Sequence, residues 1–244
     1  MRISSSHNFI FVHVPKTAGS AISNALAPFT TNPKRTILRS FLRRTPLVES
    51  HEKAHFRIHE RAVHIRAKLS STVYDRFYSF AVIRNPYDHA VSHYEFMKQY
   101  RIKSTAIRVG NMSFSEYLDY RMKRPLWNDT LFARQPAQSW FVADDDNRLL
   151  VNRLLYYESL QQDFDQLITD LSLTGAVLHK LNPTKTKTGT TSFSTYAGYY
   201  DGDSETKVRQ IYARDFRNFG YSTDICQREA EWKVSPTPFR TDQQ

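Results

Sequence analysis

The chain has 244 residues and a formal net charge of +10, with 34 Lys and Arg against 24 Asp and Glu. This length supports one substantial folded domain, and the apolar content is that of a globular protein. The excess positive charge favours an anionic partner such as a nucleotide, an acidic polysaccharide, a nucleic acid or a membrane surface. One cysteine excludes an internal disulfide framework. With no membrane-length apolar run and no signal peptide, we expect a cytoplasmic protein.

The first predicted element is a buried strand over residues 8–14, which are almost all apolar, β-branched or aromatic. Pro15 ends this strand because it fixes φ and has no N–H to donate. A turn rich in lysine and hydroxyl groups follows at residues 16–20, and a helix-like run follows over 21–26. A helix N-terminus carries unpaired N–H groups and a partial positive charge, and Lys16 adds a full charge. The pattern predicts that residues 16–20 bind a phosphate-like anion.

Apolar periodicity and capping residues predict the remaining elements. Strands are followed by helices three times, which predicts an α/β domain with a mainly parallel sheet flanked by helices. We expect one domain over residues 1–222 and an extended or partly disordered tail over 223–244. In chain order, the elements are a helix at 59–69, a buried strand at 77–83, a helix from Pro86, a helix at 114–122 opened by a Ser113/Glu116 capping box, a turn at 144–147, a strand at 149–158, a helix at 159–171, a long polar loop at 182–204, and a helix at 205–219 closed by Gly220.

A second candidate anion motif follows the strand at 77–83. Arg84 stands directly after that strand, and Ser92 lies in the helix that begins at Pro86. Carboxyl ends of parallel strands share one edge of a sheet, where open α/β sheets bind ligands. Arginine is a bidentate phosphate donor, and a serine hydroxyl can add a hydrogen bond. Two anion motifs on one edge predict a ligand with two phosphate groups.

These residues resemble a known family. The segments Pro15-Lys-Thr-Ala-Gly-Ser20 and Phe80-Ala-Val-Ile-Arg-Asn-Pro-Tyr-Asp88, with Ser92, are similar to the two nucleotide motifs of sulfotransferases. They are most similar to the carbohydrate branch, which includes the heparan 2-O and chondroitin enzymes and bacterial relatives. The resemblance continues to the segment 219–221, so it covers nearly the whole chain. It implies a P-loop-like sulfotransferase fold.

The resemblance implies that the co-substrate is PAPS, 3′-phosphoadenosine 5′-phosphosulfate, and that no metal is needed. Arg84 and Ser92 would then hold the 3′-phosphate. The loop after Asn182, with Lys185 and Lys187, would close over the nucleotide. Relatives usually carry arginine where this chain has His89. The residues implied for the 5′-phosphosulfate are Lys16, Thr17, Ala18, Gly19 and Ser20.

Sulfuryl transfer resembles phosphoryl transfer, an in-line displacement in which positioning and charge stabilisation supply most of the catalysis. Lys16 is the candidate that stabilises the leaving phosphate. The acceptor hydroxyl needs a base that titrates near neutrality. Matching the family pattern points to His59, with His55 as the second candidate and Glu60 behind them.

Several further functions fit parts of the sequence. His51-Glu-Lys-Ala-His55 fits the zinc-protease pattern His-Glu-x-x-His and would place both histidines on one face of a helix. The metzincin continuation fails at Ile58 and Arg61. An atypical small-molecule kinase and a non-catalytic basic module that binds polyanions are also compatible with these residues. No base-reading motif occurs, so we expect no nucleic-acid partner. The preferred prediction is sulfuryl transfer from PAPS to a hydroxyl acceptor, most readily a carbohydrate.

Overall fold

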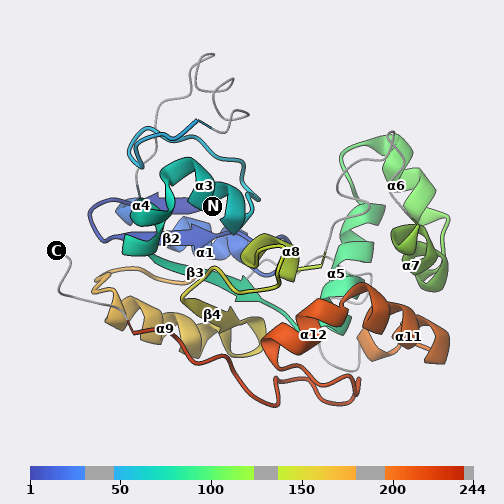
Figure 1. The fold of residues 1–244 in the computed structure, drawn as a ribbon. Helices are drawn as coiled ribbons and strands as arrows, with labels where there is room; N and C mark the ends of the chain where they lie inside the picture. The colour runs from blue at the N-terminus through green and yellow to red at the C-terminus, as the bar shows by residue number, and fades with distance from the viewer. Residues whose placement is uncertain (31–46, 124–136, 180–195, 239–244) are drawn as a thin grey trace. The chain divides into compact units, whose positions relative to one another are not determined.

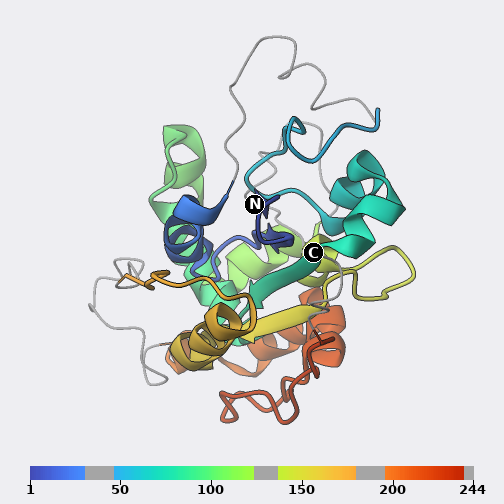
Figure 2. The same ribbon diagram turned by 90° about the vertical axis from the view of Figure 1, so that its left-hand side faces the viewer.

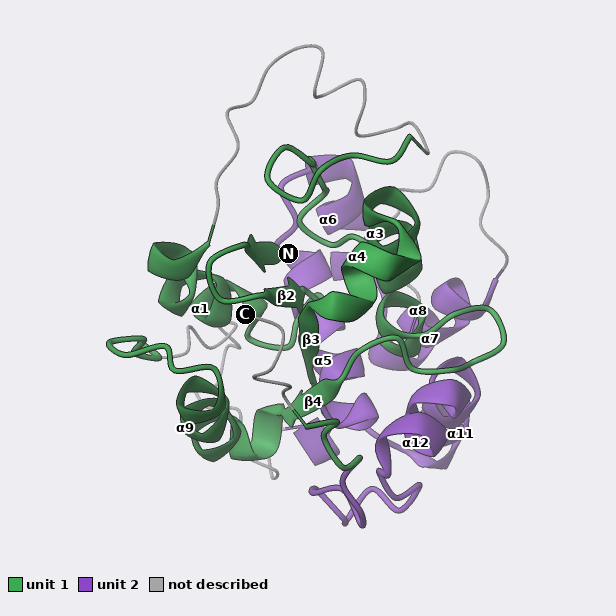
Figure 3. Cartoon of the chain, turned by 60° about the vertical axis from the view of Figure 1, so that its left-hand side comes forward, with its two compact units in different colours: residues 1–83, 138–181, 234–244 green, residues 84–137, 182–233 purple. Residues whose placement is uncertain are grey.

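The computed structural model describes residues 1–30, 47–123, 137–179 and 196–238, and Figure 1 shows its helices and strands. The chain forms two compact units, which are coloured separately in Figure 3. Unit 1 comprises residues 1–83, 138–181 and 234–244, and unit 2 comprises the rest. The single domain expected over residues 1–222 and the tail expected beyond it stay predictions. Among the described residues, no helix has both the length and the apolar character that a membrane crossing requires.

Unit 1 contains a four-stranded sheet in the order β1-β2-β3-β4. Strands β2, β3 and β4 are parallel, and β1 pairs antiparallel with β2. The register places Phe11 opposite Phe80 and Val82 opposite Leu155. Every residue of the three parallel strands is buried, which explains their continuous apolar sequences. The predicted α/β class with a mainly parallel sheet is confirmed. The strand bounds are β1 Arg2–Ser4, β2 Phe9–Val12, β3 Tyr78–Ile83 and β4 Arg153–Tyr156.

Helices cover both faces of this sheet. Figures 2 and 3 both show α1 and α9 on one side of the strands and α3 and α4 on the other. The α-helices of unit 1 are α1 Gly19–Ala25, α3 Ala62–Leu69, α4 Ser71–Arg76, α8 Ser139–Val142 and α9 Leu160–Asp170, and two 3-10 turns span Ala27–Phe29 and Tyr157–Ser159.

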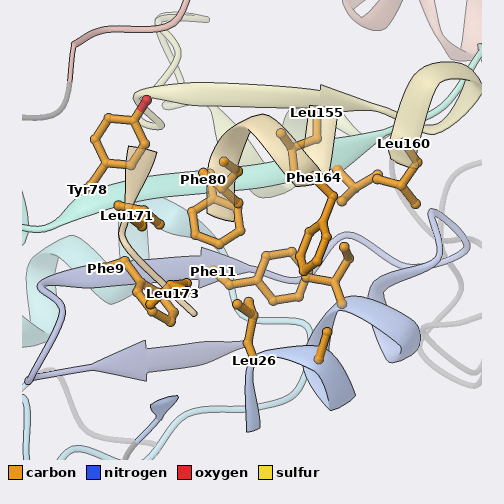
Figure 4. Close-up of a cluster of buried hydrophobic side chains, with 14 residues drawn as sticks. Phe9, Phe11, Leu26, Tyr78, Phe80, Leu155, Leu160, Phe164, Leu171 and Leu173 are labelled. Atoms are coloured by element: carbon orange, nitrogen blue, oxygen red, sulfur yellow. The ribbon is translucent and has the colours of Figure 1, made fainter. Parts of the chain in front are cut away.

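The main apolar core of unit 1 lies between the sheet and the pair α1 and α9 (Figure 4). Alternate residues of each strand point to this face, as the two-residue period of a strand requires. Phe11 and Phe80 stack with ring centroids 5.4 Å apart. From the helices, Leu26, Phe164 and Leu167 fill the layer and are buried completely. This core holds the strand ends, and therefore the loops that follow them, in fixed positions.

Unit 2 is helical in its described part, and its local sequence signals are clear. Asn85 caps α5 by accepting the Tyr87 N–H at 3.0 Å, and Pro86 takes the first helical position. The Ser113/Glu116 capping box predicted for the helix at 114–122 is confirmed, with both reciprocal hydrogen bonds present. The helices are α5 Pro86–Lys98, α6 Lys103–Gly110, α7 Phe114–Met122, α11 Gly202–Ile211 and α12 Ala213–Phe219.

The last predicted helix is two helices in the structure, α11 and α12. The segment 205–219 was expected as one helix, but it is divided between α11 and α12 at Tyr212, whose φ is −107°. Tyr212 is completely buried, and its hydroxyl is engaged by two buried side chains. This buried anchor interrupts a pattern that is helical by periodicity alone. Gly220 adopts the left-handed conformation expected of a helix C-cap, with φ 73°.

Two leucine substitutions in unit 1 test the apolar core, one within it and one at an exposed position. Leu167→Ala should lower the free energy of unfolding by about 2–5 kcal/mol, because it opens a cavity in a fully buried layer. Leu47→Ala makes the same chemical change where the side chain is 58% exposed, and its effect should stay within about 0.5 kcal/mol. Denaturant unfolding measures both, and equal effects would show that this layer is not the core.

Candidate functional site

The loop after β2 is the first part of the candidate site. Lys16 and Ala18 are not glycines, yet both adopt the left-handed conformation, with φ values of 64° and 62°. Such residues are strained and tend to occur at functional sites. Thr17 is completely buried, and its hydroxyl donates a hydrogen bond to the Val14 carbonyl at 3.0 Å. Thr17 therefore anchors the turn through its side chain.

Helix α1 begins directly after this loop. Its N-cap, Ala18, provides no side-chain hydrogen bond, and the first turn contains no acidic residue. The helix N-terminus therefore keeps its partial positive charge without a local carboxylate. Lys16 is half-buried and Ser20 is exposed. The loop and the start of α1 together present positive potential and backbone donors, as anion binding requires.

Gly19 is required by the position of His13. A Cβ atom built on Gly19 would overlap the imidazole of His13 along its Cδ2–Nε2 edge. The ring also stacks on Phe11, with centroids 5.6 Å apart. The close approach of this imidazole to the backbone of the loop explains why only glycine fits. The sequence pattern predicts Gly19 as a binding residue, whereas His13 has no local sequence signal that indicates a role.

His59 lies beside His13, in the turn before α3. The predicted helix at 59–69 begins at Ala62, because Arg61 is extended with φ −71° and ψ 141°. His59 Nδ1 lies 3.0 Å from the His13 carbonyl oxygen, and the two imidazoles meet edge to face at 4.4 Å. A carbonyl only accepts, so Nδ1 of His59 carries the proton and Nε2 has the lone pair.

Both histidines are held neutral by their surroundings. Burial lowers the pKa of His59 from its usual 6.5, although the hydrogen bond to the His13 carbonyl acts in the opposite direction. Burial lowers the pKa of His13 well below the same value, and unfavourable electrostatic interaction with the N-terminal amino group, His59 and Arg2 lowers it further. A neutral His59 can accept a proton at physiological pH. Glu60, expected behind the base, bonds instead to His64 Nδ1 and the Arg57 N–H.

Unit 1 contains a cavity of about 420 Å³. Its walls include His13 from the end of β2, Ser20 from the candidate anion loop and two further residues of α1, Ser23 and Asn24. The remaining side chains come mainly from the segment 51–58. Its size is that of a small-molecule site, and its polar groups can both donate and accept hydrogen bonds.

The zinc-protease spacing does not form a helical face. Residues 51–53 form a turn, so His51 and His55 are not held on one helix. His51 Nδ1 lies 2.8 Å from the Ser5 hydroxyl. Across the described ranges, no group of three or more His, Cys, Asp and Glu side chains is placed to hold a metal ion. Both histidines instead contribute to the wall of the cavity.

Arg84 and Ser92 belong to unit 2. The Arg84 side chain is buried, and its Nε and Nη2 atoms both lie 2.7 Å from one carboxylate oxygen of Asp88. This pair fixes the guanidinium in one orientation. Ser92 is only 6% exposed, and its buried hydroxyl has no hydrogen-bond partner in the described part of the chain. A buried hydroxyl without a hydrogen bond lowers the stability of the fold. Such groups occur where a ligand supplies the missing hydrogen bond.

His89 is completely buried in unit 2. Its Nδ1 lies 2.9 Å from the Tyr212 hydroxyl, which also accepts a hydrogen bond from Arg121 at 2.6 Å. His89 therefore contributes to the buried hydrogen-bond network of unit 2. The two loop lysines expected to close over the nucleotide, Lys185 and Lys187, lie outside the described residues.

Gly19→Ala tests the loop geometry directly. The added methyl group should displace the His13 ring and lower the free energy of unfolding by about 1–3 kcal/mol. Gly110→Ala is the control, because a Cβ at the end of α6 meets nothing within 4 Å. Thermal or denaturant unfolding of both variants measures the difference. In a His13→Ala background, Gly19→Ala should lose most of its cost, and an unchanged cost would rule out the described contact.

Comparison with known proteins agrees with these features. A family model described as the sulfotransferase family matches residues 1–222. A search of curated proteins and a search of solved structures each returned no match. The family match includes both candidate anion motifs and nearly all of the described structure, and its fold is the α/β arrangement seen in unit 1. The chain belongs to the sulfotransferase family.

Proposed function

We propose that this enzyme transfers a sulfuryl group from PAPS to a hydroxyl of a carbohydrate acceptor, and that residues 1–222 form one catalytic domain. The observation that carries the proposal is the strained loop at residues 15–20, in a chain that matches the sulfotransferase family over 1–222. Two non-glycine residues in the left-handed conformation turn the backbone around a lysine, just before an uncapped helix N-terminus. This is a suitable cradle for a phosphosulfate group.

Each motif has a distinct part in nucleotide binding. We assign the 5′-phosphosulfate to residues 16–20. We assign the backbone N–H of Thr17 to this contact because the Thr17 hydroxyl already donates its hydrogen bond to the Val14 carbonyl. We assign the 3′-phosphate to Arg84 and Ser92. The Ser92 hydroxyl, which has no hydrogen-bond partner among the described residues, supports this assignment. The Arg84 guanidinium, which Asp88 holds in one orientation, is a suitable donor to the same phosphate.

The chemistry needs charge stabilisation more than it needs a strong nucleophile. PAPS supplies a sulfuryl group that is activated by its bond to phosphate. The Lys16 ammonium offsets the negative charge that develops on the leaving phosphate oxygen, so it stabilises the transition state more than the bound substrate. The backbone N–H groups of residues 17–20 act in the same direction. Thr17 within the loop is completely buried, and charge interactions are stronger where the surroundings have a low dielectric constant.

His59 is assigned as the base for the acceptor hydroxyl. Its Nδ1–H is held by the His13 carbonyl, so the Nε2 lone pair has a defined direction. Its lowered pKa keeps the ring neutral at pH 7, where it can accept the proton that the acceptor releases. The proton therefore passes to His59 Nε2 as the acceptor oxygen takes the sulfuryl group.

Calorimetry with adenosine 3′,5′-bisphosphate tests the nucleotide assignment. The purified protein should bind this nucleotide, and Ser92→Ala should weaken binding about tenfold or more, because a hydrogen bond to a charged group is lost. The unfolding free energy should be unchanged or slightly higher in Ser92→Ala, since an unpaired buried hydroxyl is removed. Ser104→Ala, at an exposed site on α6, is the control and should bind normally. Absence of binding by the unmodified protein would end the proposal.

The pH dependence tests the base. Because the pKa of His59 is lowered, the acid limb of the kcat/KM profile should have its midpoint below 6.5, with activity falling as the pH drops through it. His59→Ala should lower kcat by about 10²–10⁴-fold and remove this limb. Binding of adenosine 3′,5′-bisphosphate should be retained. A variant that kept both the rate and the limb would exclude His59 as the base.

A further inference from the structure

His13 is a polar residue in a place that favours an apolar one. It directly follows the four buried apolar residues of β2 and is itself only 6% exposed. Its Nδ1 is buried and has no hydrogen-bond partner among the residues that the structure describes. Leaving a buried polar atom unpaired lowers stability. An apolar ring of similar size, stacked on Phe11 in the same way, would avoid this cost.

The position of His13 suggests what compensates for this cost. Its main-chain carbonyl holds His59 Nδ1, and the Cδ2–Nε2 edge of its ring faces Gly19 in the candidate anion loop. The same residue lines the cavity of about 420 Å³, together with Ser20 of that loop. His13 therefore contacts the assigned base, the assigned phosphosulfate loop and the cavity beside them.

The cavity has the polar groups that a hydroxyl-rich molecule needs. Ser20, Ser23 and Asn24 of α1 supply hydroxyl and amide groups to the lining, and His51 and His55 supply imidazoles. Arg57 adds a cation to this lining. Each of these groups can donate to or accept from a sugar hydroxyl, apart from the arginine, which only donates.

We propose that this cavity receives the acceptor and that His13 is an acceptor-binding residue, whose Nε2 hydrogen-bonds to a saccharide hydroxyl beside the one that reacts. This inference rests on the proposed function and extends it by one residue and one site. Because Nδ1 is enclosed, we assign the ligand contact to Nε2, which lies on the ring edge beside Gly19. In this proposal, the unpaired Nδ1 lowers the stability of the fold, and this loss is offset by placing an imidazole next to the base, the loop and the acceptor.

Three variants test the proposal with radiolabelled PAPS and two acceptor probes, heparosan and unsulfated chondroitin. His13→Phe keeps a ring against Phe11 and Gly19 but removes both nitrogens. It should raise the acceptor KM about tenfold or more and leave the affinity for adenosine 3′,5′-bisphosphate unchanged. His13→Gln, whose amide can replace the Nε2 hydrogen bond, should restore part of the loss. His64→Phe is the matched control, because that side chain is 58% exposed and outside the cavity lining, and it should behave as the unmodified protein does.

Stability measurements separate this role from a structural one. His13→Phe should unfold at the same temperature as the unmodified protein or higher, because a buried unpaired nitrogen has been removed. A variant that is stable but has a raised acceptor KM supports the proposal. Unchanged acceptor KM in a stable His13→Phe protein would overturn this inference alone. Failure of the unmodified protein to sulfate either polysaccharide would overturn the proposed acceptor class and this inference with it, while failure to bind the nucleotide would overturn the proposed function.

Discussion

One hydrogen bond organises the candidate site in unit 1: the contact between His59 Nδ1 and the main-chain carbonyl of His13. It joins the end of β2 to the turn before α3, two segments that are far apart in the sequence. Because the acceptor is a backbone carbonyl, the bond also determines which nitrogen of His59 carries the proton. The core beneath β2 keeps that carbonyl in place, so the apolar layer of Phe11, Phe80 and Leu26 contributes indirectly to the direction of a lone pair.

The loop and the core also constrain one another. Thr17 contributes its hydroxyl to the interior of the turn, and Gly19 leaves room for an imidazole. The left-handed residues between β2 and α1 cost conformational energy, which the packing on both sides must offset. In the proposed site, a loop held by these contacts would lose little entropy on binding and would keep its donors aligned during transfer.

Much of this arrangement could be predicted from the sequence. Continuous apolar runs indicated β2 and β3, and the residues Ser113 and Glu116 marked the start of α7, because these signals are local. Short elements without a strong period, such as β1 and α6, were not predicted. Tyr212 divides a periodic segment through contacts made to His89 and Arg121, which no local pattern encodes. The role of His13 could not be predicted either, because its contacts with His59 and Gly19 are also not encoded in a local pattern.

The contact of Arg84 with Asp88 has a consequence for turnover. Before any nucleotide arrives, the Asp88 carboxylate already neutralises part of the guanidinium charge. In the proposed site, a phosphate would share Arg84 with a permanent anionic neighbour, so its attraction would be weaker than that of an isolated arginine. The spent nucleotide carries its charge away at the end of each cycle, and in many enzymes product release limits the rate. In the proposed site, an arginine held by a carboxylate would orient the nucleotide and would also let it leave.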